Sequence, residues 1–139
     1  MVAFERVKSG IEQLDETLDN IRLGDNVVWQ VSNLNEFSYL VNPYVKQALE
    51  DGRNLIYINF GQHEPLIPMC DEDFEELEAE RNNPETEFAM IERNGIKIYK
   101  VDPMEQFESF TLEVHNIISK EGYDAFYVFD CLSDLQSAW

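Results

Sequence analysis

The feature that most constrains the fold is an alternation of short apolar segments with longer stretches of helical character. The apolar segments cover residues 26–31, 54–60, 96–101 and 125–130, and they are rich in the β-branched and aromatic residues that favour strands. Alternation of this kind predicts parallel strands joined by right-handed helical crossovers. We therefore predict an α/β fold, a three-layer, mostly parallel twisted sheet with helices on both faces. Trp29, inside the first segment, is expected in the core.

Two crossover helices are predicted between these strands, and each ends at a glycine. Residues 36–51 precede Gly52 and residues 103–121 precede Gly122, and glycine is common just beyond a helix end because it tolerates a positive φ. Pro43 falls inside the first of these helices, where it lacks the backbone N–H of a helical hydrogen bond. A late start or a kink is expected there.

The region between the second and third strands is predicted to be helical as well. Residues 71–80 are strongly acidic with apolar residues at Phe74 and Leu77, which indicates a solvated helix; a docking face for a basic partner is the alternative. The spacing does not match a calcium loop. A further helical stretch is expected over residues 85–93, ending at Asn94-Gly95.

Charge and composition exclude several classes of function. The formal net charge is −18, from 28 acidic against 10 basic residues, and such a field repels nucleic acids. Cys70 and Cys131 have no zinc or disulfide spacing. No membrane span or signal peptide is recognised, so a cytoplasmic location is expected. A length of 139 residues suits one domain, and an ending soon after a strong strand suggests an N-terminal fragment of a longer chain.

Residues 7–15, Val-Lys-Ser-Gly-Ile-Glu-Gln-Leu-Asp, resemble the opening of the KaiC-type domains of the RecA family. A Leu23-Gly24-Asp25 turn into the first strand follows in family order, and so does the strand that ends at Asp130, which corresponds to the Walker B strand. The resemblance implies a single RecA/KaiC-like domain over residues 1–139, truncated after that strand.

The phosphate-binding loop of that family, G-x-x-x-x-G-K-[ST], would fall on residues 31–38. Val31 and Glu36 stand in place of the two glycines, Phe37 in place of the lysine, and only Ser38 is retained. A phosphate loop needs glycine for close backbone approach and lysine for charge, so neither ATP binding nor ATPase activity is expected. Ser38 and Asp130 would remain as a vestigial nucleotide site, with no catalytic residue, cofactor or metal.

The resemblance implies a non-hydrolytic pseudo-ATPase module that acts in regulation or protein assembly. Its partners would be another protein or further copies of itself, and neither nucleic acid nor membrane. Degenerate modules of this kind also resemble the N-terminal regions of some phosphoenolpyruvate synthase or pyruvate, phosphate dikinase-like proteins, which would place catalytic domains downstream, although no motif of those domains is present.

A small-molecule sensor or enzyme that uses the same crevice for a ligand other than ATP is the alternative function. The candidate lining residues are Ser32, Asn33, Asn35, Gln62, His63, Asp130 and Ser133.

Overall fold

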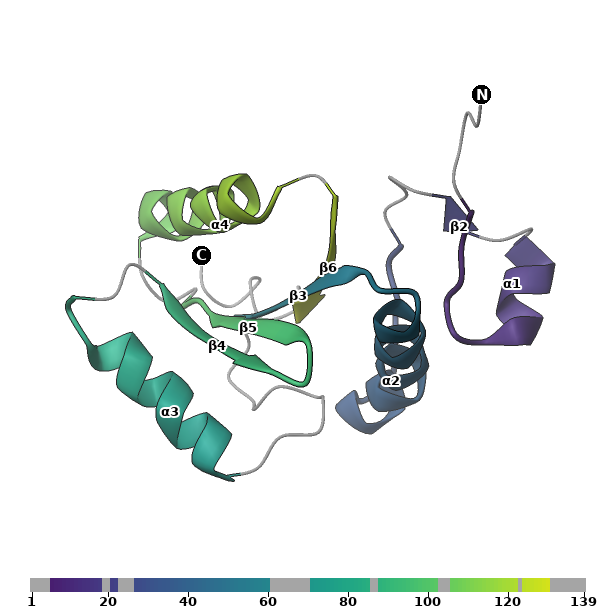
Figure 1. Ribbon diagram of the computed structural model, residues 1–139, viewed down its shortest axis with the longest axis horizontal. Coiled ribbons are helices and arrows are strands. Elements are labelled where there is room, and N and C mark those ends of the chain that lie inside the picture. Colours follow the sequence, from purple (N-terminus) through teal and green to yellow (C-terminus); the bar gives the residue numbers. More distant parts are fainter. Residues whose placement is uncertain are drawn as a thin grey trace. The chain divides into compact units, whose positions relative to one another are not determined.

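The computed structural model describes residues 6–18, 21–22, 27–60, 71–85, 88–102, 106–122 and 124–130 (Figure 1). The chain divides into two compact units, Met1–Arg53 and Asn54–Trp139. Among the described residues, the first unit contains a small two-stranded sheet and two helices, and the second contains a four-stranded sheet and two helices.

In the first unit, strand β1 (Arg6–Val7) pairs antiparallel with β2 (Ile21–Arg22), and helix α1 (Glu12–Leu18) lies between them in sequence. The long helix α2 (Leu34–Glu50) follows. Gly10 lies close to α2, because a Cβ atom built on it would stand 2.1 Å from the carbonyl oxygen of Pro43. Glycine also suits the φ of +90° at this position.

Helix α2 begins at Leu34, two residues before the predicted start, and Pro43 lies inside it. The expected late start is wrong because Asn33 caps the helix: its side-chain oxygen accepts a hydrogen bond from the Glu36 N–H at 3.2 Å. The other end is as predicted. Gly52 has a φ of +72° and donates its N–H to the carbonyl oxygen of Leu49 at 3.1 Å.

The second unit is an α/β unit built on a mixed sheet. Its strands are β3 (Asn54–Asn59), β4 (Ala89–Arg93), β5 (Ile96–Lys100) and β6 (Ala125–Asp130), and their order in the sheet is β4-β5-β3-β6. β3 pairs parallel with both β5 and β6, whereas β4 pairs antiparallel with β5. The second, third and fourth predicted strands are thus confirmed, and the sheet is mixed.

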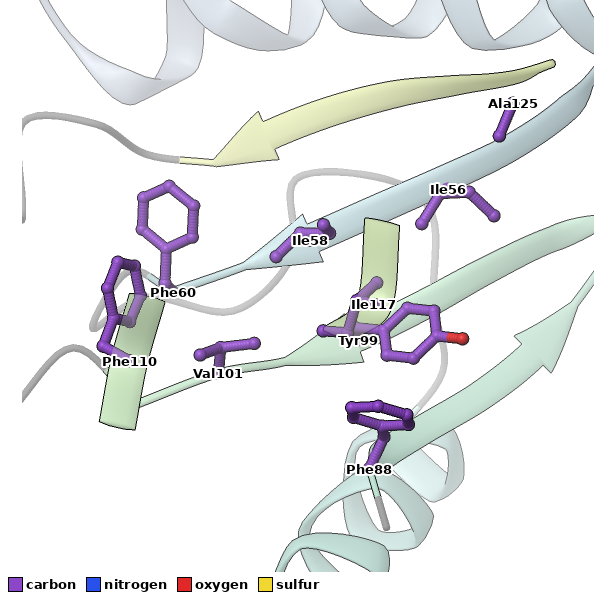
Figure 2. Close-up of a cluster of buried hydrophobic side chains, with 9 residues drawn as sticks. All are labelled: Ile56, Ile58, Phe60, Phe88, Tyr99, Val101, Phe110, Ile117 and Ala125. Carbon is purple, nitrogen blue, oxygen red and sulfur yellow. The ribbon is translucent and has the colours of Figure 1, made fainter. Parts of the chain in front are cut away.

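Helices lie on both faces of this sheet. Alternate residues of β3 face helix α4 (Phe107–Glu121) and form with it the core cluster drawn in Figure 2. In this cluster the rings of Phe60 and Phe110 pack edge to face, with 5.6 Å between their centroids. On β4, Met90 packs toward this cluster, so Ile91 and Arg93 point the other way. Helix α3 (Asp71–Asn82) packs there, because Arg93 bonds to its Asp73.

The predicted helix over residues 85–93 is wrong, because residues 89–93 form strand β4. The turn that joins β4 to β5 is Asn94-Gly95, and both residues have positive φ, +54° and +84°. These values are those of a type I′ turn, whose twist matches that of the flanking strands of a hairpin. The local turn therefore favours strand pairing over a helix end.

The predicted strand over residues 26–31 is also wrong where the structure describes it, since residues 27–31 form no strand. Val28 is 77% exposed, and Trp29 is half-buried rather than in the core. The Trp29 ring contacts Phe37 at 6.4 Å and Tyr44 at 6.1 Å, both edge to face. Aromatic contacts with α2, and not sheet pairing, position this segment.

Candidate functional site

Polar side chains gather at the carboxyl ends of the three parallel strands. Asn59 of β3 is aligned with Lys100 of β5 on one side and with Asp130 of β6 on the other. Aligned residues of neighbouring strands share a face, and Tyr57 shares it because it lies two residues before Asn59. These four residues, Tyr57, Asn59, Lys100 and Asp130, are called the carboxyl-end cluster.

Hydrogen bonds join the four members of the carboxyl-end cluster in series. The Tyr57 hydroxyl and the Asn59 amide nitrogen both donate to Oδ2 of Asp130, the second at 3.4 Å. Lys100 Nζ donates to Oδ1 of Asn59 at 2.8 Å. Tyr57, Asn59 and Asp130 are all at most 1% exposed, so the bonds from Tyr57 and Asn59 provide Oδ2 of Asp130 with donors where water does not reach.

The pKa of Lys100 is lowered from its ordinary value. Burial, and then the neighbouring charge of Arg81, lower the pKa of Lys100, while Glu78, Asp130 and Asp102 act in the opposite direction. Arg81 is itself engaged, with its Nη2 at 2.5 Å from Oδ2 of Asp102. Lys100 therefore lies within electrostatic reach of the ion pair between Arg81 and Asp102.

The carboxyl-end cluster lies where an α/β sheet commonly binds ligands. Helix α3, which follows β3, packs on one face of the sheet, and helix α4, which follows the neighbouring β5, packs on the other. The three parallel strands stand in the order β5-β3-β6, so the chain order reverses between β3 and β6, and such a reversal defines a topological switch point. Asn59 and Asp130 end these two strands, so their hydrogen bond lies at that point.

The remaining described candidates lie at the start of α2, in the first unit. The Ser32 N–H donates to Oε2 of Glu36 at 2.8 Å, and Asn33 caps the helix. Ser38 Oγ donates to the carbonyl oxygen of Asn35 at 2.8 Å. The structure thus brings Ser32, Asn33, Asn35 and Ser38 together and places Asp130 in the second unit. Gln62, His63 and Ser133 lie outside the described residues.

Tyr57, Asn59 and Lys100 were given no role from the sequence alone. The available signal was a pair of polar residues spaced two apart in the buried part of β3, which reads Leu-Ile-Tyr-Ile-Asn after the exposed Asn54. A period of two places both on one face. Buried polar residues on one face of a strand indicate a partner for them on the neighbouring strand, which here is Asp130.

The residues that carry the family resemblance at the N-terminus are in contact with one another. The Ser9 side chain is fully buried, its Oγ accepts a hydrogen bond from the Ile11 N–H at 3.1 Å, and its own N–H donates to Asp15. Gly10 between them is the residue that approaches Pro43. The Ser-Gly-Ile and Asp residues of this string therefore have structural roles in the first unit.

Comparison of the chain with known protein families, curated proteins and solved structures found no match. Within the described residues, no three or more His, Cys, Asp or Glu side chains are grouped as a metal site would require. None of the described helices is long and apolar enough to cross a membrane.

Proposed function

We propose that this chain is a nucleotide-independent module of the RecA/KaiC type that acts in regulation or assembly through contacts with other proteins. The observation that carries this proposal is the position of Glu36. Its carboxylate accepts the Ser32 N–H at 2.8 Å beside the amino end of α2, where a phosphate-binding domain would present free backbone N–H groups to an anion.

The charge around Glu36 supports the proposal. A phosphate that approached this helix end would meet a carboxylate, and two like charges at about 4 Å repel by about 1 kcal/mol in water and about 4 kcal/mol at an intermediate dielectric. Asn33 adds a second internal acceptor, for the Glu36 N–H. Two backbone donors of this segment, the N–H groups of Ser32 and Glu36, are thus satisfied by the chain itself.

The basic residues of the second unit that the structure describes are also engaged. Arg93 bonds to Asp73, Lys97 to Glu121 and Lys100 to Asn59. Arg81 pairs with Asp102, and the Lys120 ammonium lies 5.3 Å from the centre of the Phe88 ring. A polyphosphate would have to displace existing partners to gain these charges.

Isothermal titration calorimetry with ATP, ADP and a cyclic dinucleotide, each with magnesium, tests this proposal. No binding is expected, and a Kd for ATP tighter than roughly 100 μM, or about 5.5 kcal/mol, would refute the nucleotide-independent part. The double variant Glu36→Gly/Phe37→Lys is the stricter comparison, with Glu36→Gln as the matched control for loss of charge alone.

Analytical ultracentrifugation over a range of concentrations tests the protein-contact part. Self-association would identify further copies of the chain as the partner. A monomer at every concentration refutes the homo-oligomeric form and leaves another protein as the partner to be isolated.

A second candidate function, sensing of a small ligand, is supported by the place of the carboxyl-end cluster at a topological switch point. NMR spectra of the folded protein with a library of small neutral and zwitterionic compounds separate the two functions. Shifts confined to Asn59, Lys100 and their neighbours would favour the sensor, and an unchanged spectrum favours the protein-binding module.

A further inference from the structure

Helix α3 is unusually rich in acidic residues. Seven of its 12 residues are acidic. They are Asp71, Glu72, Asp73, Glu75, Glu76, Glu78 and Glu80. Side chains three or four residues apart are neighbours on a helix, and like charges at that spacing destabilise it. Six acidic pairs have this spacing: 71–75, 72–75, 72–76, 73–76, 75–78 and 76–80.

Burial and ion pairs with two arginines offset part of this repulsion. Leu77 is 3% exposed, and Arg93 of β4 binds two acids of one helical face, Asp73 at 2.7 Å and Glu76. At the other end of α3, Arg81 pairs with Asp102 and lies 3.9 Å from Oε1 of Glu78. Glu72 and Glu75 are exposed and, among the described residues, stand at ion-pair distance from no basic side chain.

Added salt does not weaken the repulsion among the α3 carboxylates and the ion pair between Arg93 and Asp73 to the same extent. Repulsion among exposed carboxylates is screened by added ions, whereas a partly buried ion pair is screened much less. The Asp73 side chain is 15% exposed and that of Arg93 is 35% exposed. Rising ionic strength therefore weakens the repulsion within α3 more than it weakens the bond between Arg93 and Asp73.

We infer that the folding of α3 and its docking on β4 are controlled by ionic strength, with the helix loosened at low salt and ordered at high salt. Glu72 and Glu75 are the main source of the repulsion, because they take part in four of the six pairs. Arg93 keeps the helix on β4. This conformational switch is independent of whether the chain binds nucleotides or other proteins.

Amide hydrogen exchange at about 0.01 M and about 1 M KCl tests the inference, since the Debye length falls from roughly 30 Å to roughly 3 Å between them. Protection of the α3 amides is expected to rise with salt by a larger factor than protection of the β3 amides. Equal factors for α3 and β3, or α3 protection that is constant or falls with salt, would overturn it.

The double variant Glu72→Gln/Glu75→Gln sharpens the test. Each like-charge pair lowers the helix-forming equilibrium by a factor of roughly 1.4 to 2.3, so removing four pairs should raise α3 protection at low salt about fourfold to thirtyfold. The response of α3 to salt should become correspondingly smaller. An unchanged salt response of α3 in this variant would contradict the inference.

Two further variants serve as controls. Glu12→Gln/Glu16→Gln removes the same charge from exposed positions of α1, and it should leave the salt response of α3 as in the unmodified chain. Arg93→Gln should lower α3 protection at both salt concentrations. If the α1 variant changed the salt response of α3 as much as the α3 variant does, the effect would arise from the net charge of the chain alone.

Discussion

The backbone N–H of Ser9 donates to both carboxylate oxygens of Asp15, at 3.0 and 3.2 Å. This contact joins the chain before α1 to the helix itself, and it positions Gly10 where only a residue without a side chain fits against Pro43. The hydrogen bonds from Ser9 to Asp15 therefore hold the two ends of this string together in the first unit.

Replacement of Gly10 by alanine should destabilise the protein strongly. The new Cβ would stand 2.1 Å from the Pro43 carbonyl oxygen, and the φ of +90° is unfavourable for alanine. We therefore expect the free energy of unfolding to fall by at least about 3 kcal/mol. Urea unfolding measures this change. Gly52→Ala is the matched control, because Gly52 also has a positive φ but nothing within 4 Å of its Cβ position. The free energy of unfolding of Gly52→Ala should fall by only about 1–2 kcal/mol. Equal losses of stability in the two variants would show that the contact with Pro43 is unimportant.

Tyr57→Phe should lower the free energy of unfolding by about 1–3 kcal/mol, because it removes a hydrogen-bond donor to the buried carboxylate of Asp130. Chemical denaturation gives the difference. Tyr39→Phe, at a position 76% exposed, should have no measurable effect. A neutral result for Tyr57→Phe would mean that this hydroxyl does not stabilise the carboxyl-end cluster.

The ionisation of Tyr44 should appear as an alkaline loss of stability. Burial raises the pKa of Tyr44 to about 12, with a smaller opposing effect of Arg53. Its phenol is thus neutral in the folded state between pH 10 and 12, where an unfolded chain ionises. Stability from this group is full below pH 10 and falls by about 3 kcal/mol as the pH rises through 12.

Ultraviolet absorbance of tyrosinate, together with unfolding measured against pH, follows this ionisation. Tyr44→Phe should remove the high-pH component of the titration and reduce the slope of stability above pH 10. A titration curve that is the same with and without Tyr44 would rule out the raised pKa.

Substitution of Gly95 by alanine should weaken the β4–β5 hairpin. Gly95 has a φ of +84° in the two-residue turn, and alanine there costs about 1–2 kcal/mol. Asn94→Gly should be tolerated, since type I′ turns accept glycine at both central positions. NMR chemical shifts of β4 and thermal unfolding report the effect. Equal stability of Gly95→Ala and the unmodified chain would argue against this turn type.

Much of the second unit could be predicted from the sequence because β3, β5 and β6 are rich in β-branched and aromatic residues and Gly122 follows α4. These features predict β3, β5 and β6. They do not predict β4, because Ala89, Met90 and Ile91 also fit a helix, and Asn94-Gly95 fits a helix end as well as a hairpin turn.

The first unit was harder to predict. Val27, Val28 and Trp29 have strand propensity, yet propensity does not show whether a partner strand is available, and the ring of Trp29 packs on Phe37 and Tyr44 instead. For the candidate site, Asp130 could be singled out as the polar end of a strand. Its bonds to Tyr57 and Asn59 depend on sheet order, which the sequence does not specify.

The strand order also bears on how the second unit reaches its native state. The β4–β5 hairpin closes through two residues, and hairpins form in about 1–10 μs. The pairing of β3 with β6 joins residues 71 positions apart, such as Asn59 and Asp130. Contacts so distant in sequence form slowly because loop closure must precede them. We expect the parallel pairing of β3 with β6 to limit the folding rate, and the carboxyl-end cluster to assemble among the last parts of the unit.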